Sequence, residues 1–260
     1  MNLNLKGKKA LVCGSTQGIG KASALELASL GASVILVARN EEELKKVKSE
    51  LSGPGNHDYI VADFSKPEEL KQKVNSYILS HGTIDILVNN TGGPASGPIT
   101  EAKTEDFVQT FSNHLICNHI LAQAVLEGMK KNGYGRIINI ISTSVKQPLK
   151  NLGVSNTIRA AVANWSKTLA GEVAKYGITV NNVLPGATLT IRLKSIIDAK
   201  ATKTGMNVET VQQEMLQEIP MNRFAEASEI ANAVGFLASP AASYITGINV
   251  PVDGGRTLCL

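Results

Sequence analysis

The chain has 260 residues, 43% hydrophobic and 18% charged, which suits one large folded core and excludes a disordered, charge-rich protein. Its net charge of +4 is scattered over short groups of lysines and only 4% of the residues are aromatic, which argues against nucleic-acid binding. The three cysteines are widely spaced and match neither a disulfide framework nor a zinc motif. The sequence shows no signal-peptide pattern and no run of about 18 apolar residues. We therefore expect a cytoplasmic protein with no membrane span.

Short β-branched or apolar runs alternate with amphipathic stretches of helical length along the whole chain. This alternation is typical of βαβ units, and no linker or internal repeat divides the chain. It predicts one doubly wound α/β domain over residues 1–260, with a seven-stranded parallel sheet and helices on both faces. The predicted strands span residues 10–13, 33–38, 59–62, 84–89, 136–141, 179–184 and 248–252. The predicted helices span residues 18–30, 41–51, 66–80, 104–130, 154–175 and 227–238.

The first predicted strand runs directly into the segment CGSTQGIG, residues 13–20. Its glycines, Gly14, Gly18 and Gly20, allow a tight turn, let the backbone approach a pyrophosphate, and direct the N-terminus of the next helix at that anion. A plain glycine-rich turn is the alternative. The position between the first strand and the first helix favours a dinucleotide-binding loop.

The second predicted strand ends in Ala38-Arg39-Asn40. At this point, about 20 residues after the glycine loop, an acidic residue would bind the ribose 2′-hydroxyl of NAD, whereas an arginine suits the 2′-phosphate of NADP. Arg39 therefore predicts NADP, with NAD as the less favoured cofactor. The alternative is a surface arginine that pairs with the glutamates at 41–43, which begin the next helix.

Two later segments predict local structure, one a helix start and the other an irregular segment. Ser65-Lys66-Pro67-Glu68 predicts a helix with Ser65 as its N-cap, a proline in the first turn and a capping-box glutamate. Residues 188–220 interrupt the alternation with polar and small side chains, which predicts a mobile lid or substrate loop with helical pieces.

The segment GVSNTIRAAV, residues 153–162, opens a predicted helix with Ser155 and Arg159 four residues apart. Side chains at this spacing project over one face, while Ile158 and Val162 lie on another. A hydroxyl and a guanidinium are thus placed together at the start of a long helix.

Four motifs, in this order along the chain, resemble those of the short-chain dehydrogenase/reductase family, and the resemblance covers almost the entire chain. They are the glycine spacing of residues 14–20, NNTGG at 89–93, PGATLT at 185–190 and ITGINVPVDGG at 245–255. The resemblance, which is to the 3-oxoacyl carrier-protein reductase branch, implies a Rossmann-type fold, a nicotinamide cofactor and a carbonyl or alcohol substrate, with an acyl thioester as one candidate. It also implies a homodimer or homotetramer formed through the helices at 104–130 and 154–175.

The resemblance further implies which residues surround the cofactor. Most of them follow the carboxyl ends of the predicted strands. The implied cofactor-binding residues are Gly14, Ser15, Thr16, Gly18, Ile19, Gly20, Arg39, Asp63, Phe64, Asn90, Thr91, Gly92, Arg159, Pro185, Gly186 and Thr190.

Members of the family use a tyrosine to transfer the proton as hydride moves, a lysine four residues later to lower its pKa and hold the ribose, and a serine to orient the substrate oxygen. The segment IINIIS places the matching serine at Ser142. The family spacing then puts the tyrosine and lysine positions on Ser155 and Arg159. The asparagine of the family's proton relay aligns with His114, although Asn113 is one residue away.

Serine and arginine at positions 155 and 159 cannot supply the proton that the family's tyrosine supplies, but they can keep contacts with the cofactor. An aliphatic hydroxyl is a far weaker acid than a tyrosine, and an arginine does not give up its proton, yet Arg159 can still bind ribose hydroxyls. His114, with an ordinary pKa of about 6.5, could act as the acid, and Lys146 could polarise an oxyanion. The alternatives are a histidine on a helix surface and a solvated loop lysine. We expect an NADP(H)-dependent oxidoreductase with an atypical active site; the alternative is a catalytically inactive cofactor sensor or partner protein.

Overall fold

The computed structural model describes residues 1–259, and seven strands of this range form one sheet. The strands are β1 (Lys9–Cys13), β2 (Ser33–Ala38), β3 (Asp58–Val61), β4 (Ile86–Asn89), β5 (Gly135–Ile140), β6 (Ile178–Pro185) and β7 (Asn249–Val252). All neighbours pair in parallel, in the order β3-β2-β1-β4-β5-β6-β7. The order reverses between β1 and β4, which is where doubly wound sheets open a ligand crevice at the carboxyl ends of the strands. The predicted seven-stranded parallel sheet is confirmed.

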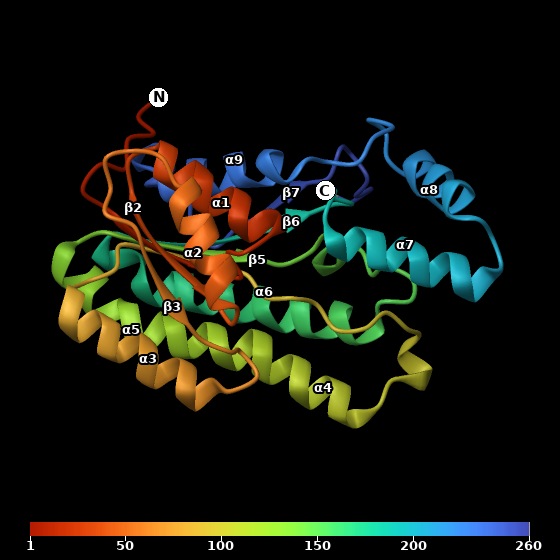
Figure 1. The fold of residues 1–260 in the computed structure, drawn as a ribbon, viewed down its shortest axis with the longest axis horizontal. Helices are drawn as coiled ribbons and strands as arrows, with labels where there is room; N and C mark the ends of the chain where they lie inside the picture. The colour runs from red at the N-terminus through yellow and green to blue at the C-terminus, as the bar shows by residue number, and fades with distance from the viewer. Residues whose placement is uncertain (260) are drawn as a thin grey trace.

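Helices cover both faces of the sheet (Figure 1). They are α1 (Gly18–Ser29), α2 (Glu41–Glu50), α3 (Pro67–His81), α4 (Thr104–Phe111), α5 (Cys117–Asn132), α6 (Gly153–Val173), α7 (Ile191–Thr204), α8 (Val208–Gln217) and α9 (Ala227–Ala238). Alternate residues of β1 face opposite ways: Val12 packs into a core with α1, α2 and α9, whereas Leu11 packs into a second core with α3, α5 and α6. Because both faces are covered, the strands read as nearly continuous apolar runs.

Two local predictions are corrected by the structure. Ser65 is not the N-cap of α3: Lys66 takes that position without a side-chain hydrogen bond, and the Ser65 backbone N–H donates to Asp63 Oδ1 at 2.9 Å. The predicted helix at 104–130 is interrupted by a π-helical turn, Ser112–Ile116, between α4 and α5. The wider π turn is a common device at functional sites, and here it places His114 in the interior.

Four asparagines form a ladder through the interior of the sheet. Asn89, Asn139, Asn182 and Asn249 are register partners on β4, β5, β6 and β7. Each side-chain amide donates to the carbonyl of the next: Asn89 to Asn139 at 2.8 Å, Asn139 to Asn182 at 3.0 Å and Asn182 to Asn249 at 2.8 Å. The chain of amides satisfies most of the polar groups that burial would otherwise penalise, whereas Asn89 Oδ1, at its inner end, has no partner within the described residues.

The segment at 188–220 does contain helical pieces, namely α7 and α8. They lie together at one end of the molecule (Figure 1) and share a small core that includes Leu193, Ile197, Val211 and Met215. The mobility expected of this segment stays a prediction.

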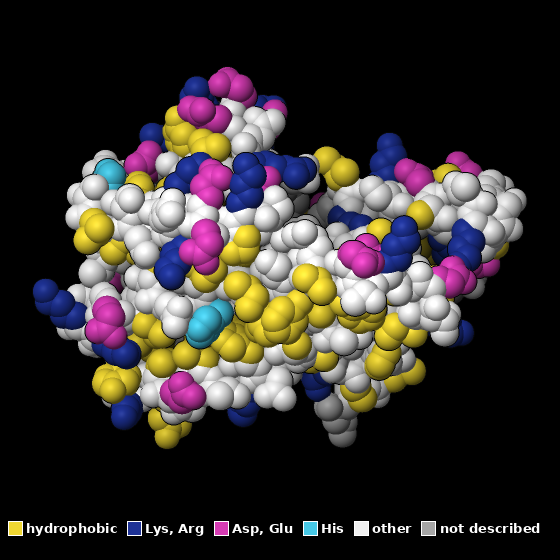
Figure 2. Space-filling model, turned by 90° about the horizontal axis from the view of Figure 1, so that it is seen from below, with side chains coloured by type: hydrophobic (Ala, Val, Ile, Leu, Met, Phe, Trp, Pro, Cys, Tyr) yellow, Lys and Arg dark blue, Asp and Glu magenta, His cyan; other side chains and the backbone are white. Residues whose placement is uncertain are grey.

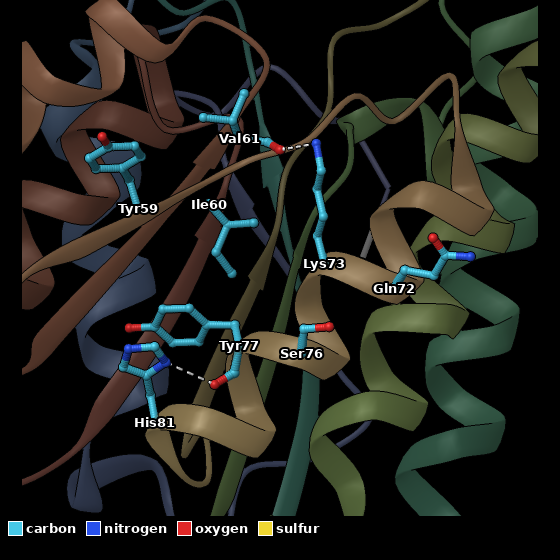
Figure 3. Close-up of a pocket in the computed structure, with 8 residues that line it drawn as sticks. All are labelled: Tyr59, Ile60, Val61, Gln72, Lys73, Ser76, Tyr77 and His81. Carbon is cyan, nitrogen blue, oxygen red and sulfur yellow. Dashed lines mark hydrogen bonds between the residues drawn. The ribbon is translucent and has the colours of Figure 1, made fainter.

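Two surface features lie outside the crevice. A depression of about 570 Å³ runs between the edge strand β3 and α3, where Tyr77 stacks on His81 and Lys73 Nζ donates to the Val61 carbonyl at 2.7 Å (Figure 3). On the side of the molecule formed by α3 to α6, hydrophobic side chains form a broad band (Figure 2). Within residues 1–259, no helix is long and apolar enough to cross a bilayer.

Candidate active site

The loop between β1 and α1 has a shape that only glycine permits. Gly14 and Gly18 have φ of +60° and +52°, the left-handed region that glycine adopts without strain. A Cβ on Gly20 would lie 2.1 Å from the Gly14 carbonyl oxygen, so no larger residue fits there. The Asn90 amide, which follows β4, donates to the Cys13 and Gly14 carbonyls at 3.3 and 3.4 Å and holds the turn in place.

The N-terminus of α1 offers free backbone donors to an anion. Its N-cap is Gln17, whose side chain makes no capping hydrogen bond, and the first turn carries no acidic residue. Thr190 approaches from the other side, since its Cγ2 lies 3.1 Å from a Cβ built on Gly18. The first helical N–H groups and the positive end of the helix dipole thus suit the pyrophosphate of a dinucleotide.

The remaining predicted cofactor residues surround this loop. Ser15 is buried and donates to the Val37 carbonyl at 3.5 Å, while Thr16 and Ile19 are partly buried. Pro185 ends β6, and Gly186 follows it against Asp253, whose Cα would lie 2.7 Å from an added Cβ. Phe64 follows β3, and its carbonyl accepts from the Cys117 thiol.

Arg39 is exposed at the carboxyl end of β2 and, among the described residues, forms no ion pair. Glu41 pairs instead with Lys45 at 3.3 Å and accepts from the Tyr59 hydroxyl at 3.1 Å. The Ser65 backbone N–H holds the pKa of Asp63 below its usual range, with a smaller contribution from the Arg39 charge. Arg39 and Asp63 follow the neighbouring strands β2 and β3 at the same edge of the sheet, and among the described residues the Arg39 guanidinium forms no ion pair.

His114 is buried, and both of its ring nitrogens are engaged. Nδ1 lies 2.8 Å from the Thr91 hydroxyl, and Nε2 lies 3.1 Å from the Gly92 carbonyl oxygen. A carbonyl only accepts, so Nε2 donates to it, and a neutral ring then accepts from Thr91 at Nδ1. Burial, followed by the nearby Arg159 charge, lowers the pKa of His114 to about 3, which keeps the ring neutral at physiological pH.

Arg159 of α6 contacts the end of β5, two residues before Ser142. The Arg159 guanidinium donates to the carbonyl of Ile140, the last residue of β5, at 2.8 Å. Ser142 follows two residues later, and its hydroxyl accepts from the Ser144 N–H at 3.1 Å. Ser155 is buried on α6, one turn before Arg159. Burial, with a smaller contribution from Arg192, lowers the pKa of Arg159 to about 10, so this side chain remains a cation.

The structure adds Arg192, a residue that the sequence did not single out. It lies on the first turn of α7, and its guanidinium donates to the Pro94 carbonyl. A hollow of about 170 Å³ adjoins this contact, lined by residues 92–95 and by α4 residues that include Asp106 and Gln109. The sequence placed Arg192 in the substrate segment, but only the fold shows where its long side chain reaches.

A glycine loop between the first strand and first helix of a doubly wound sheet defines the dinucleotide-binding class of α/β proteins. Comparison with known proteins narrows this class. The family model for enoyl-(acyl carrier protein) reductase matches residues 14–257. The 3-oxoacyl-(acyl-carrier-protein) reductase FabG of Vibrio cholerae is 37% identical over 255 residues, which cover 97% of this chain and 98% of that protein.

Further relatives agree with this placement. The NADPH-dependent reductase BacG of Bacillus subtilis is 32% identical over 95% of this chain and 97% of its own length. The L-sorbose reductase of Gluconobacter frateurii, solved with NADPH and L-sorbose, superposes with a TM-score of 0.93 at 34% identity over 100% of both chains. The chain therefore belongs to the short-chain dehydrogenase/reductase family, and it resembles the 3-oxoacyl carrier-protein reductases.

Proposed function

We propose that the protein is an NADP(H)-dependent oxidoreductase that interconverts a carbonyl compound and an alcohol without the tyrosine and lysine of its family. The observation that carries this proposal is the cofactor crevice: the glycine loop, the uncapped start of α1 and the free Arg39 all face the carboxyl ends of the strands. The relatives named above are reductases, which favours an oxidoreductase over a non-catalytic sensor.

Arg39 is the residue assigned to cofactor choice. Its guanidinium can form paired hydrogen bonds with a 2′-phosphate, and no carboxylate among the described residues forms an ion pair with it. NADPH, when bound, supplies the hydride. Backbone N–H groups of the glycine loop and α1 would hold its pyrophosphate, and Arg159 stands at the position of the family's ribose-binding lysine.

The chain's own residues must then stabilise the negative charge that develops on the substrate oxygen. Arg159 remains protonated near neutral pH, so its guanidinium can stabilise the negative charge that develops on this oxygen. The Ser142 hydroxyl accepts from the Ser144 N–H, which leaves its own hydrogen free to orient the same oxygen, and Ser155 adds a second hydroxyl. Neither serine is an acid at neutral pH, so we assign the final proton to water.

We revise the role of His114 accordingly. A ring with a pKa of about 3 and with both nitrogens bonded to Thr91 and Gly92 holds the turn after β4 and is not the replacement acid. The absence of a positioned acid lowers the expected rate by on the order of 10²- to 10⁴-fold relative to a family member with the tyrosine.

Calorimetric titration with NADP⁺, NADPH, NAD⁺ and NADH tests the cofactor assignment. We expect NADP(H) to bind more tightly than NAD(H), and Arg39→Ala to weaken NADP(H) about 10- to 100-fold because charge-assisted hydrogen bonds are lost. Lys46→Ala is the matched control, since it removes an exposed cation of α2 that forms no ion pair within residues 1–259. Equal affinity of the wild-type protein for both cofactors would contradict the assignment.

The double variant Ser155→Tyr with Arg159→Lys tests the catalytic part. We expect it to gain carbonyl reduction with NADPH, because it restores the family's acid in a crevice that is otherwise intact. Loss of activity on this change would show that the native chemistry depends on Ser155 or Arg159 themselves. If neither protein turns over any of a broad panel of ketones and alcohols while cofactor is bound, the sensor alternative is correct.

We also infer that the part of the hydrophobic band that lies over α4 and the adjoining π-helical turn pairs two copies of the chain. Val108, Phe111 and Ile116 are 65%, 38% and 38% exposed there, an arrangement that marks an interaction surface (Figure 2). Sedimentation of the wild-type protein should give a dimer or tetramer, and Val108→Glu should shift it towards monomer. A single domain over residues 1–260 and a cytoplasmic location remain further predictions.

A further inference from the structure

Two arginines from different helices converge on one backbone position in the crevice. A Cβ built on Gly93 would lie 3.5 Å from Arg192 Nη2 and 3.6 Å from Arg159 Nη2. Arg159 comes from α6 and Arg192 from the first turn of α7, so the two cations meet only in the folded protein. Gly93 follows β4, next to the hollow of about 170 Å³.

Both guanidiniums are partly buried and make few hydrogen bonds within the described residues. Each makes one hydrogen bond to a carbonyl, Arg159 to Ile140 and Arg192 to Pro94, and neither pairs with a carboxylate within residues 1–259. A guanidinium carries five N–H donors, so most of these donors are unused. Asp106 lines the adjoining hollow, but its carboxylate accepts from the Lys103 N–H at the start of α4.

Another arginine shows how this protein satisfies a buried guanidinium that has only a structural role. Arg136 is 3% exposed and donates to three carbonyls, those of Gly135, Gly177 and Ser239. Arg159 and Arg192, which are partly buried, lack such a set, and the charge of each opposes burial of the other. Burial, together with Arg192, already lowers the pKa of Arg159, as expected for cations brought together away from water.

We propose that Arg159 and Arg192 together bind the carboxylate of the substrate beside Gly93, so that the enzyme acts on small oxo acids or hydroxy acids. This inference rests on the proposed function and narrows it to one substrate class. A carboxylate accepts paired hydrogen bonds from a guanidinium and cancels the repulsion between the two cations. Placed there, it would lie beside Arg159, whose guanidinium also contacts the Ile140 end of β5.

Calorimetry with two probes of similar size separates charge from shape. Oxamate carries a carboxylate beside a carbonyl and is not reduced, whereas oxamide is its neutral counterpart. We expect oxamate, and not oxamide, to bind the NADP⁺ complex. Arg192→Ala should weaken oxamate at least 10-fold, and Arg192→Lys should recover part of the loss. The matched control is Lys194→Ala, which removes an exposed cation from the same helix.

The outcomes distinguish this inference from the proposed function. Equal binding of oxamate and oxamide, or no oxamate binding with or without cofactor, overturns the carboxylate site. An Arg192→Ala variant that loses NADP⁺ affinity but keeps oxamate affinity also overturns it, because the arginines would then serve the cofactor phosphates. Oxamate binding without turnover of any oxo acid supports the site and refutes the oxidoreductase. Reduction of an oxo acid with unchanged KM and rate in Arg192→Ala supports the oxidoreductase and refutes the site.

Discussion

The buried, neutral His114 makes the stability of this protein depend on pH in a calculable way. Its pKa is about 3 in the folded chain and about 6.5 when unfolded, so the unfolded state binds the extra proton between these values. The stabilisation is therefore complete above about pH 6.5 and is lost as the pH falls towards 3. Linkage gives a loss of about 2 kcal/mol between pH 7.5 and pH 5.0 from this one group.

Urea unfolding of the wild-type protein and of His114→Gln at these two pH values isolates the effect. Glutamine can still accept from Thr91 and donate to Gly92, but it does not titrate. We expect the wild type to lose about 2 kcal/mol more than the variant on acidification. His119→Gln, an exposed histidine of α5, should behave like the wild type. If His114→Gln and the wild type lose the same stability, the ring is not buried as a neutral base, and the reasoning fails.

The other predictions concern the glycine loop and the asparagine ladder. Gly20→Ala should abolish cofactor binding measured by calorimetry, because its Cβ would lie 2.1 Å from the Gly14 carbonyl oxygen. The control is Gly171→Ala on α6, where an added Cβ has open space. It should keep cofactor binding and raise the free energy of unfolding by up to about 1 kcal/mol. Asn139→Ala should cost about 3 kcal/mol in urea unfolding, because it leaves buried amide groups on two strands unpaired. Asn249→Ala, at the partly exposed end of the ladder, should cost about 1 kcal/mol, and equal losses in the two variants would contradict this account.

Periodicity was sufficient for most of the fold, since strands buried on both faces and amphipathic helices leave strong local patterns. Predicted β2 and α9 agree with the structure residue for residue, and most other boundaries differ by one or two residues. The Ser65 cap failed because Asp63, two residues earlier, took the backbone N–H of that turn. The π turn that brings His114 inward left no mark in the hydrophobic pattern.

The candidate site was predictable only where its residues are contiguous. The glycine loop and the position of Ser155 and Arg159 can be located by spacing, because they occupy short segments with fixed local geometry. The meeting of Arg192 with Arg159, and of His114 with Thr91, depends on how separate elements pack. No pairwise contact of this kind is encoded in a local pattern.

The lysine that bridges α3 and the edge strand β3 also restricts how the protein can associate with itself. An edge strand offers unpaired carbonyl and N–H groups to any extended chain that meets it. Here Lys73 occupies the Val61 carbonyl and places a charge at the rim, and β3 is only four residues long (Figure 3). These features disfavour the addition of a further strand at the outer boundary of the sheet, which leaves the helix faces as the favoured surfaces for ordered assembly on this side.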